Sequence, residues 1–123
     1  MIDRIRLTAA AKIQLSTLKR KTGIEHYNSI CRHALCISLA NPSTPPEEDF
    51  NFANGIEIDW RTFTGGNEEF YLNLLLLRTR QDELSTKIDD VRQVCARHLH
   101  RGLSYLAGKE DSFMVEAFLE LPS

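Results

Sequence analysis

Glycines and prolines divide this chain into segments of helical length, and this division constrains its fold more than any other feature. Gly23, Asn41-Pro42 and Gly108 each stand where an apolar pattern of helical spacing stops. A left-handed glycine or a proline ends a helix. The 123 residues are about one domain's length of chain. We therefore expect a single, mainly α domain over residues 1–123, with four helices and a few short strands.

The first 40 residues predict a strand, a helix, a turn and a second helix. Residues 4–7 alternate charged and apolar side chains, as a half-exposed strand does. Thr8 is a suitable N-cap for a helix over 9–22, which Gly23 ends. The second helix is expected over 27–39. The inward-facing positions of the first helix are Ala11, Leu15, Leu18 and Thr22.

The middle of the chain, residues 41–67, is rich in proline, carboxylates and the pair Gly65-Gly66, which disfavour a long helix. Within it, residues 56–60 alternate cleanly and predict a second strand. Pairing of that strand with residues 4–7 would set two arginines beside two carboxylates. The four residues concerned are Arg4, Arg6, Glu57 and Asp59.

The last third predicts a pair of helices and a tail. Asn67 is expected to cap the third helix, with acidic residues in its first turn. The buried stripe expected there is Phe70, Leu74, Leu77 and Leu84, and Leu72, Leu75 and Leu76 are expected to widen the buried sector. The fourth helix should end at Gly108. Its expected stripe is Ile88, Val91, Cys95, His98, Gly102 and Leu106. Residues 113–119 are expected to form a strand or a docked extension.

Charge is distributed unevenly, although the net charge is only −2. Residues 1–40 hold seven Lys/Arg and two carboxylates, whereas residues 41–70 hold one Arg and seven carboxylates. Opposed surface charges can steer a polyanion to one side of a domain. The alternative is that the acidic stretch neutralises the basic one, within the fold or across a subunit contact. We divide the domain into a basic part over 1–40, an acidic connection over 41–67 and a helix pair with tail over 68–123.

The first helix carries most of the candidate binding residues. Lys12 and Lys19 are seven residues apart and share a face, and Arg20 and Lys21 extend the charge around the last turn. Cations at a helix C-terminus are favoured by the helix dipole, but Lys12 lies too early for that explanation. We expect these cations to contact DNA phosphates. Backbone N–H groups near residues 26–28 would add donors at the start of the second helix.

No enzyme motif is present, and we expect no catalytic residues, metal or cofactor. The chain lacks a G-x-S-x-G, a P-loop and a G-x-G-x-x-G. Cys31, Cys36 and Cys95 contain no C-x-x-C pair and are expected to be reduced. His98 and His100 point to opposite helix faces. Cys95 and His98 share a face, but one pair does not make a ligand set.

The expected location is the cytoplasm, without membrane contact. The start of the chain has no basic stretch followed by an apolar block. The longest apolar run, residues 74–77, is far shorter than the ~18 residues of a membrane span.

The order of elements over residues 1–40 is also similar to the ribbon-helix-helix proteins, whose paired strands enter the major groove. In that arrangement Arg4 and Arg6 would contact bases. This hypothesis of a transcriptional regulator leaves the acidic middle and the second helix pair unexplained.

The whole chain resembles the DndE family of DNA phosphorothioation proteins. The runs that carry the resemblance are Ile5-Arg6-Leu7-Thr8-Ala9-Ala10-Ala11, Leu18-Lys19-Arg20-Lys21-Thr22-Gly23-Ile24, Cys31-Arg32-His33-Ala34-Leu35-Cys36-Ile37-Ser38-Leu39 and Asn54-Gly55-Ile56-Glu57-Ile58-Asp59-Trp60. The resemblance implies a small, non-catalytic protein in a restriction-modification setting. Its partners would be a cysteine desulfurase, an iron–sulfur adenylating enzyme and an ATPase, which together replace a non-bridging phosphate oxygen by sulfur. It further implies homotetramers and a preference for nicked duplex DNA.

The positions that match the family's DNA-binding role are Lys12, Lys19, Arg20 and Lys21, with Arg4 and Arg6 as further candidates. Gly23 would serve the interhelical turn and hence assembly. Two other functions stay open. One is a protein-interaction adaptor that docks a basic partner on the acidic segment 47–59. The other is an enzyme, such as a nickase, for which no residue set is apparent.

Overall fold

The computed structural model describes residues 2–108 and is mainly helical, as expected. Its elements are β1 (Arg4–Leu7), α1 (Ala9–Thr22), α2 (Tyr27–Ala40), β2 (Ile56–Asp59), α3 (Trp60–Thr64), α4 (Glu68–Gln81) and α5 (Ile88–Ala107). The described residues thus hold five helices where the sequence analysis predicted four. The strand or extension predicted over 113–119 lies outside the described residues.

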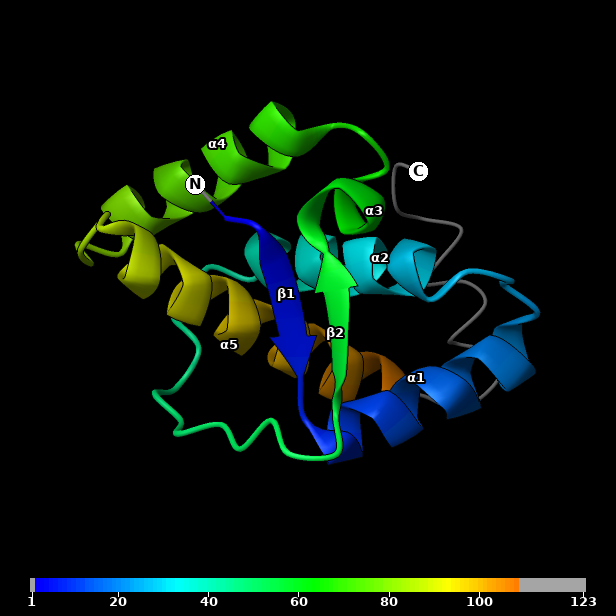
Figure 1. Cartoon of the computed structure of the whole chain (residues 1–123). Coiled ribbons are helices and arrows are strands. Elements are labelled where there is room, and N and C mark those ends of the chain that lie inside the picture. The colour runs from blue at the N-terminus through cyan, green and yellow to red at the C-terminus, as the bar shows by residue number, and fades with distance from the viewer. Residues whose placement is uncertain (1, 109–123) are drawn as a thin grey trace.

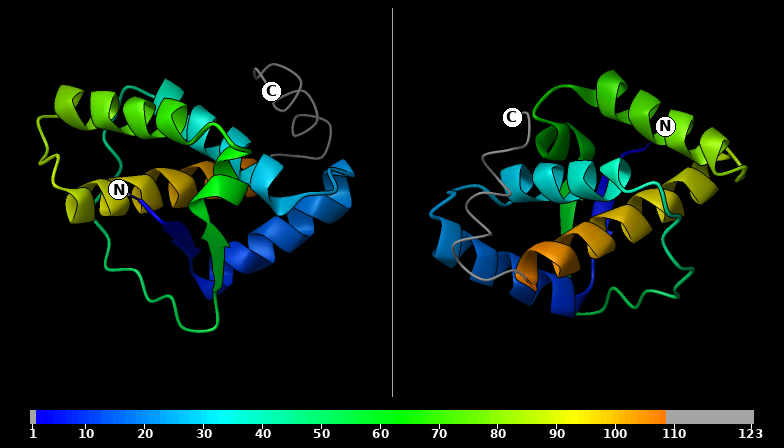
Figure 2. Two further views of the ribbon diagram at one scale, coloured as in Figure 1. Left: turned by 45° about the horizontal axis from the view of Figure 1, so that its top comes forward. Right: turned by 180° about the vertical axis from the view of Figure 1, so that it is seen from behind.

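Helix α5 forms the centre of the domain and contacts α1, α2, α4 and β1. The two-stranded sheet lies on one side of α5, and α2 crosses on the other (Figure 1). Helices α1 and α4 lie at opposite margins of the molecule, as both views in Figure 2 also show. Among residues 2–108, no helix is long and apolar enough to cross a membrane.

The predicted pairing of the two strands is confirmed. They run antiparallel, with Arg4 opposite Asp59 and Arg6 opposite Glu57. The predicted strand was one residue too long, because Trp60 begins α3. Asp59 ends the strand and caps this short helix, since its Oδ2 accepts a hydrogen bond from Thr62 N at 3.2 Å. An aspartate at an N-cap position satisfies backbone donors that would otherwise lack a partner.

The predicted start and end of α1 are confirmed. Thr8 Oγ1 accepts from Ala11 N at 3.1 Å, which caps the first turn. Gly23 has a left-handed φ of 72°, and its N–H donates to the Lys19 carbonyl oxygen at 3.0 Å. Of the predicted stripe, Ala11, Leu15 and Leu18 are buried and Thr22 is half-buried. The helix therefore presents its charged residues away from the core.

The stripe predicted for α4 is wrong, although Leu75 of the widened sector is buried as predicted. Phe70 is 59% and Leu77 is 55% exposed, and Leu84 lies beyond the end of the helix. The buried residues are Tyr71, Leu75, Arg78 and Thr79. Arg78 decides this orientation, because its guanidinium donates to the carbonyl oxygens of Leu39 and Ser43 and pairs with a carboxylate. Asn67 occupies the N-cap position, but its side chain makes no capping hydrogen bond, contrary to the prediction.

The stripe predicted for α5 is confirmed, and it packs closely on α2. Cys95, His98 and Leu106 on this stripe are buried. A Cβ on Gly102 would overlap the carbonyl oxygen of Ala34, so only glycine permits this helix crossing. Gly108 ends the helix as expected, although with a right-handed φ of −83°.

A chain of polar groups crosses the α2–α5 interface. Arg101 Nε donates to Ser38 Oγ at 2.8 Å, and that hydroxyl lies 2.7 Å from His98 Nδ1. Because Arg101 can only donate, the Ser38 oxygen accepts its hydrogen bond, and the same hydroxyl links Arg101 to the imidazole of His98. Burial, followed by the charges of Arg78 and Arg101, lowers the pKa of His98 to about 4. His98 is therefore neutral at physiological pH.

Candidate nucleic-acid interface

The outer side of α1 presents the cations that the sequence analysis selected. Lys12, Lys19, Arg20 and Lys21 are all exposed. At about 100° per residue, Lys12 and Lys19 lie within about 20° of each other on one flank. Arg20 lies further around the same side, and Lys21 lies on the other flank. Arg20 is about 100° around the helix from Lys19, and Lys21 is about 100° further on. We refer to Lys12, Lys19 and Arg20 as the row of cations on α1.

Three of these cations are not matched with carboxylates in the described part of the chain. Lys12, Lys19 and Arg20 have no ion-pair partner among residues 2–108. Their positive charge is therefore available to an external anion. The carboxylates of the acidic connection do not neutralise this row within the described part of the subunit.

Lys19 is held in place by the start of α2. Its Nζ lies 5.1 Å from the centre of the Tyr27 ring, a cation–π contact. The Tyr27 hydroxyl in turn lies 3.1 Å from Ser16 Oγ on α1. From the sequence, Tyr27 is expected near the site only through its backbone N–H. The role of its ring depends on how α1 and α2 meet in space and is not visible in the sequence.

The N-terminus of α2 adds a second positive feature beside Lys19. The N-cap residue, His26, makes no side-chain capping hydrogen bond, and the first turn contains no acidic residue. The first N–H groups of a helix point outward and favour an anion. Together with Lys19, this end of α2 is suited to a phosphate oxygen.

Arg4 and Arg6 are placed differently. Arg4 Nη1 lies 3.2 Å and Arg6 Nε lies 3.0 Å from the carboxylate of Glu57. Arg4 also lies 3.5 Å from Asp3. The hydrogen bond from Arg4 to Glu57 and the nearby carboxylates raise the pKa of Arg4. Both arginines are thus partly neutralised, and their contact with DNA stays a prediction.

Arg32, another cation of the basic part, serves the fold. Its Nη1 donates to the Phe63 carbonyl oxygen at 2.8 Å, and its Nη2 donates to Ser29 Oγ at 3.2 Å. The guanidinium therefore ties α2 to α3. The basic excess of residues 1–40 is concentrated on α1 once Arg4, Arg6 and Arg32 are set aside.

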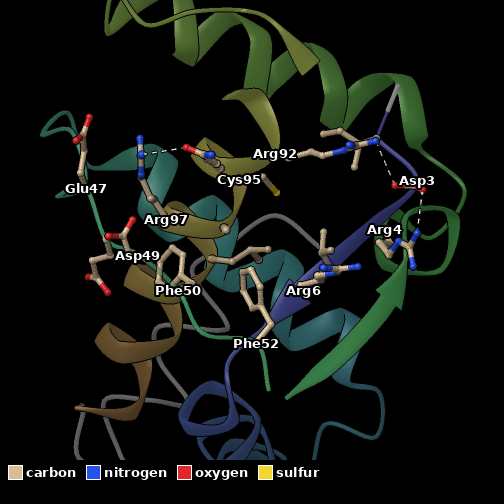
Figure 3. A pocket seen from close by; sticks show the side chains of 16 residues that line it. Asp3, Arg4, Arg6, Glu47, Asp49, Phe50, Phe52, Arg92, Cys95 and Arg97 are labelled. Atoms are coloured by element: carbon tan, nitrogen blue, oxygen red, sulfur yellow. Dashed lines mark hydrogen bonds and ion pairs between the residues drawn. The ribbon is translucent and has the colours of Figure 1, made fainter. Parts of the chain in front are cut away.

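A cavity of about 860 Å³ lies between β1, the connection after α2 and α5 (Figure 3). Charges of both signs line it. The cations are Arg4, Arg6, Arg92 and Arg97, and the carboxylates are Asp3, Glu47, Glu48 and Asp49. Phe50 and Phe52 point into it, and Phe50 stacks on His100 with ring centres 4.2 Å apart. The balanced charge does not favour a phosphate there. This cavity was not predictable from the sequence, because its walls come from three distant segments.

The described cysteines do not have the properties of nucleophiles. Burial raises the pKa values of Cys31 and Cys95 to about 12 and also raises that of Cys36. All three therefore remain thiols at neutral pH. Within residues 2–108, no three His, Cys, Asp or Glu side chains are grouped to hold a metal ion.

Comparison with known proteins identifies the family. None of the curated proteins compared with the chain matches it. The family model for the DNA sulphur modification protein DndE matches residues 4–113, which include the two strands, the five helices and the cations of α1. The chain therefore belongs to the DndE family, and its role is in DNA sulfur modification.

Proposed function

We propose that this protein is a non-catalytic, cytoplasmic accessory of DNA sulfur modification that binds duplex DNA as a homo-oligomer. It grips the backbone phosphates with the cations of α1. It works beside the iron–sulfur adenylating enzyme and the ATPase of the system. The observation that carries the proposal is the row of Lys12, Lys19 and Arg20, which is exposed and lacks carboxylate partners among residues 2–108.

The spacing of the row suits a nucleic-acid backbone. Lys12 and Lys19 are separated by about 10 Å along the helix axis. One DNA strand advances about 3.4 Å per nucleotide, so the two lysines span about three nucleotides. Contacts of this kind bind phosphates without reading sequence. We therefore expect binding that is sequence-independent and sensitive to salt.

Several copies are needed to make this surface effective. One subunit supplies only the row of three cations and Lys21, whereas an oligomer multiplies the phosphates contacted at once. Gly23 lies at the end of α1 and sets the direction in which α2 leaves. We propose that its left-handed turn is needed for the assembled form, as the family resemblance implies.

Preference for a nick follows from the same physical picture. A surface built from several subunits contacts more phosphates when the duplex bends toward it. Bending an intact site costs on the order of 1–6 kcal/mol. A nick acts as a hinge and lowers that cost. We therefore expect tighter binding to nicked duplex than to intact duplex of the same sequence.

The proposal is tested by reversing two charges on the row. Lys12→Glu with Lys19→Glu should weaken binding to a nicked duplex by about 100-fold at low salt, because two attractive phosphate contacts become repulsive. The matched control is Lys87→Glu, the same change at an exposed residue before α5. Light scattering should report the wild-type mass for both variants.

Unchanged affinity of the double variant at wild-type mass would overturn the proposed binding face. Equal loss in the Lys87→Glu control would assign the effect to total charge and not to α1. Strand cleavage by the pure, metal-supplemented protein would overturn the non-catalytic part of the proposal.

A protein-interaction adaptor is the second candidate function. Glu47, Glu48 and Asp49 are exposed and have no ion-pair partner within residues 2–108. By contrast, Glu57 and Asp59 of the same acidic segment serve the sheet and the α3 cap. Capture of a sulfur-modification protein that survives complete loss of DNA binding, and is lost on Glu47→Lys with Glu48→Lys, would favour this function.

The ribbon-helix-helix hypothesis receives less support from the strand pairing. Its ribbon forms between two copies of the first strand. Here β1 pairs with β2 of the same chain. An intermolecular ribbon would have to use the other edge of β1.

A further inference from the structure

The outer face of α4 carries an apolar stripe with no cover in the described part of the subunit. Phe70 and Leu77 are 59% and 55% exposed, and the partly buried Leu74 lies between them. Their i, i+4, i+7 spacing places all three on one face. The inner face of the same helix already supplies Tyr71 and Leu75 to the core. The fold itself therefore gives no reason for the apolar residues outside.

Two opposite charges flank this stripe. Glu69 and Arg80 are both exposed and have no ion-pair partner among residues 2–108. They are eleven residues apart, so they lie within about 20° of each other around the helix and about 16 Å apart along it. The stripe thus has a carboxylate at one end and a guanidinium at the other end, on the same flank.

This arrangement is complementary to itself when a second α4 runs antiparallel. A two-fold axis near Leu74 would place Glu69 of each copy opposite Arg80 of the other. The same axis would place Phe70 opposite Leu77 of the second copy and Leu74 opposite Leu74. A parallel pair would instead bring carboxylate to carboxylate and guanidinium to guanidinium. Like charges in contact are unfavourable, so the charges select the antiparallel pair.

We propose that the outer face of α4 is an interface with a second copy of this chain, formed by an antiparallel α4–α4 pair about a two-fold axis. Phe70, Leu74 and Leu77 form its apolar centre, and two Glu69–Arg80 ion pairs flank it. An isologous contact of this kind is the commonest symmetry of soluble oligomers. The inference rests on the homo-oligomer in the proposed function and names one of its surfaces.

The position of α4 is compatible with DNA binding. Helices α1 and α4 lie at opposite margins of the domain (Figures 1 and 2). Pairing through α4 would therefore leave the cations of α1 uncovered. It would also supply two copies of the α1 row to one assembly.

Charge reversal and its rescue test the interface. Glu69→Arg alone and Arg80→Glu alone should each weaken self-association by at least about tenfold, measured by light scattering over a concentration series. The double variant, Glu69→Arg with Arg80→Glu, should restore the association within about twofold. Glu47→Arg, the same substitution on the connection, is the matched control and should have no effect.

Mixing provides a second readout that a change within one subunit cannot reproduce. In a mixture of the two single variants, one copy carries arginine at both positions and the other copy carries glutamate at both. Each contact across the two-fold axis then again joins opposite charges. The mixture should therefore associate like the wild type, although each variant alone does not. Unchanged association of the single variants, or no recovery in either the double variant or the mixture, would overturn the α4 interface.

Leu77→Asp keeps the test independent of the charge variants. It places a carboxylate beside the proposed apolar centre, at a residue that is exposed within the subunit and not needed for its core. The variant should have wild-type circular dichroism and a smaller assembly mass. Wild-type mass would contradict the interface. If a helix of another protein covers this face instead, Leu77→Asp would keep the wild-type mass. The charge reversal on α1 would still weaken DNA binding in that case.

Discussion

Helices α1 and α4 are both 14 residues long and both lie at the margin of the domain, yet their outer faces differ in chemistry. Helix α1 exposes three lysines, an arginine and one large apolar side chain, Ile13, whereas α4 exposes Phe70 and Leu77. The inner faces bury three and four residues, respectively, against the same core. The core requires only the inner faces, so the outer faces are free to carry function. One is suited to an anion and the other to an apolar surface.

Charges elsewhere in the molecule sharpen this contrast. Arg78 and Arg101 both donate to the Ser43 carbonyl oxygen, at 2.8 and 2.7 Å, and so hold the start of the long connection in place. Arg4 and Arg6 pair with Glu57. These guanidinium groups have partners within the fold, whereas Lys12, Lys19 and Arg20 have no ion-pair partner in the described part of the chain.

The largest effect should come from a change that destabilises the whole fold, because both outer faces depend on it. Gly102→Ala would place a Cβ against the Ala34 carbonyl oxygen, so α2 and α5 would have to move apart. We expect a loss of about 3 kcal/mol or more in the free energy of unfolding. Urea denaturation followed by circular dichroism measures it. Wild-type stability would show that this crossing does not fix the spacing of the core.

Acid should also destabilise the fold that carries both outer faces, because His98 is buried at its centre. Its pKa is about 4 in the folded protein, against 6.5 for a free histidine. Between these values the unfolded chain binds a proton that the folded chain does not. The contribution of neutral His98 to the free energy of unfolding is therefore fully present above about pH 6.5. It is lost as the pH falls toward 4, by up to about 3 kcal/mol.

Denaturation at pH 7 and pH 4.5 measures this effect, with His98→Gln as the comparison. The variant should lose less stability between the two pH values than the wild type. An equal loss would assign the acid sensitivity to other groups, such as His100, whose pKa is lowered by burial.

A smaller effect is expected from a substitution that affects the outer face of α1 and leaves that of α4 unchanged. Tyr27→Ala removes the ring on which Lys19 rests. We expect DNA affinity to fall by about two- to fivefold, corresponding to a cation–π contact of about 0.5–1 kcal/mol. Tyr27→Phe keeps the ring and should bind DNA nearly as well as the wild type. An equal loss in both variants would assign the role to the hydroxyl and its contact with Ser16.

The smallest effect is expected on β1. Arg6→Gln should change DNA affinity by less than about twofold, because Glu57 already neutralises this guanidinium. Arg20→Gln makes the same substitution on α1 and should weaken binding more. Electrophoretic mobility shifts on one nicked duplex compare them directly. A larger loss for Arg6→Gln would extend the DNA-binding face across the sheet.

The sequence predicted α1 and its cations because that helix has one continuous apolar stripe, with Ile13 as the one large apolar side chain outside it. Only one orientation then buries Ala11, Leu15 and Leu18. The exposure of Lys12 and Lys19 follows from that orientation. The pairing of Arg4 and Arg6 with Glu57 was equally predictable, because strand alternation fixes which side chains share a face.

The orientation of α4 was not predictable in the same way. Its leucines at 74–77 surround the helix, so apolar periodicity does not distinguish an inner face from an outer face. The deciding contacts come from Arg78 to carbonyl oxygens more than 30 residues away. Helix α3 was missed because Trp60 continues the alternation of β2, although Asp59 caps a helix at that point.

The dependence of DNA affinity on salt tests the central claim most directly. A triple variant, Lys12→Gln with Lys19→Gln and Arg20→Gln, removes the row on α1 without adding carboxylates. For each subunit in contact with duplex DNA, the slope of log affinity against log salt should become shallower by about 2.7, about 0.9 for each lost phosphate contact. An unchanged slope at unchanged oligomer mass would show that these three cations do not contact the phosphates.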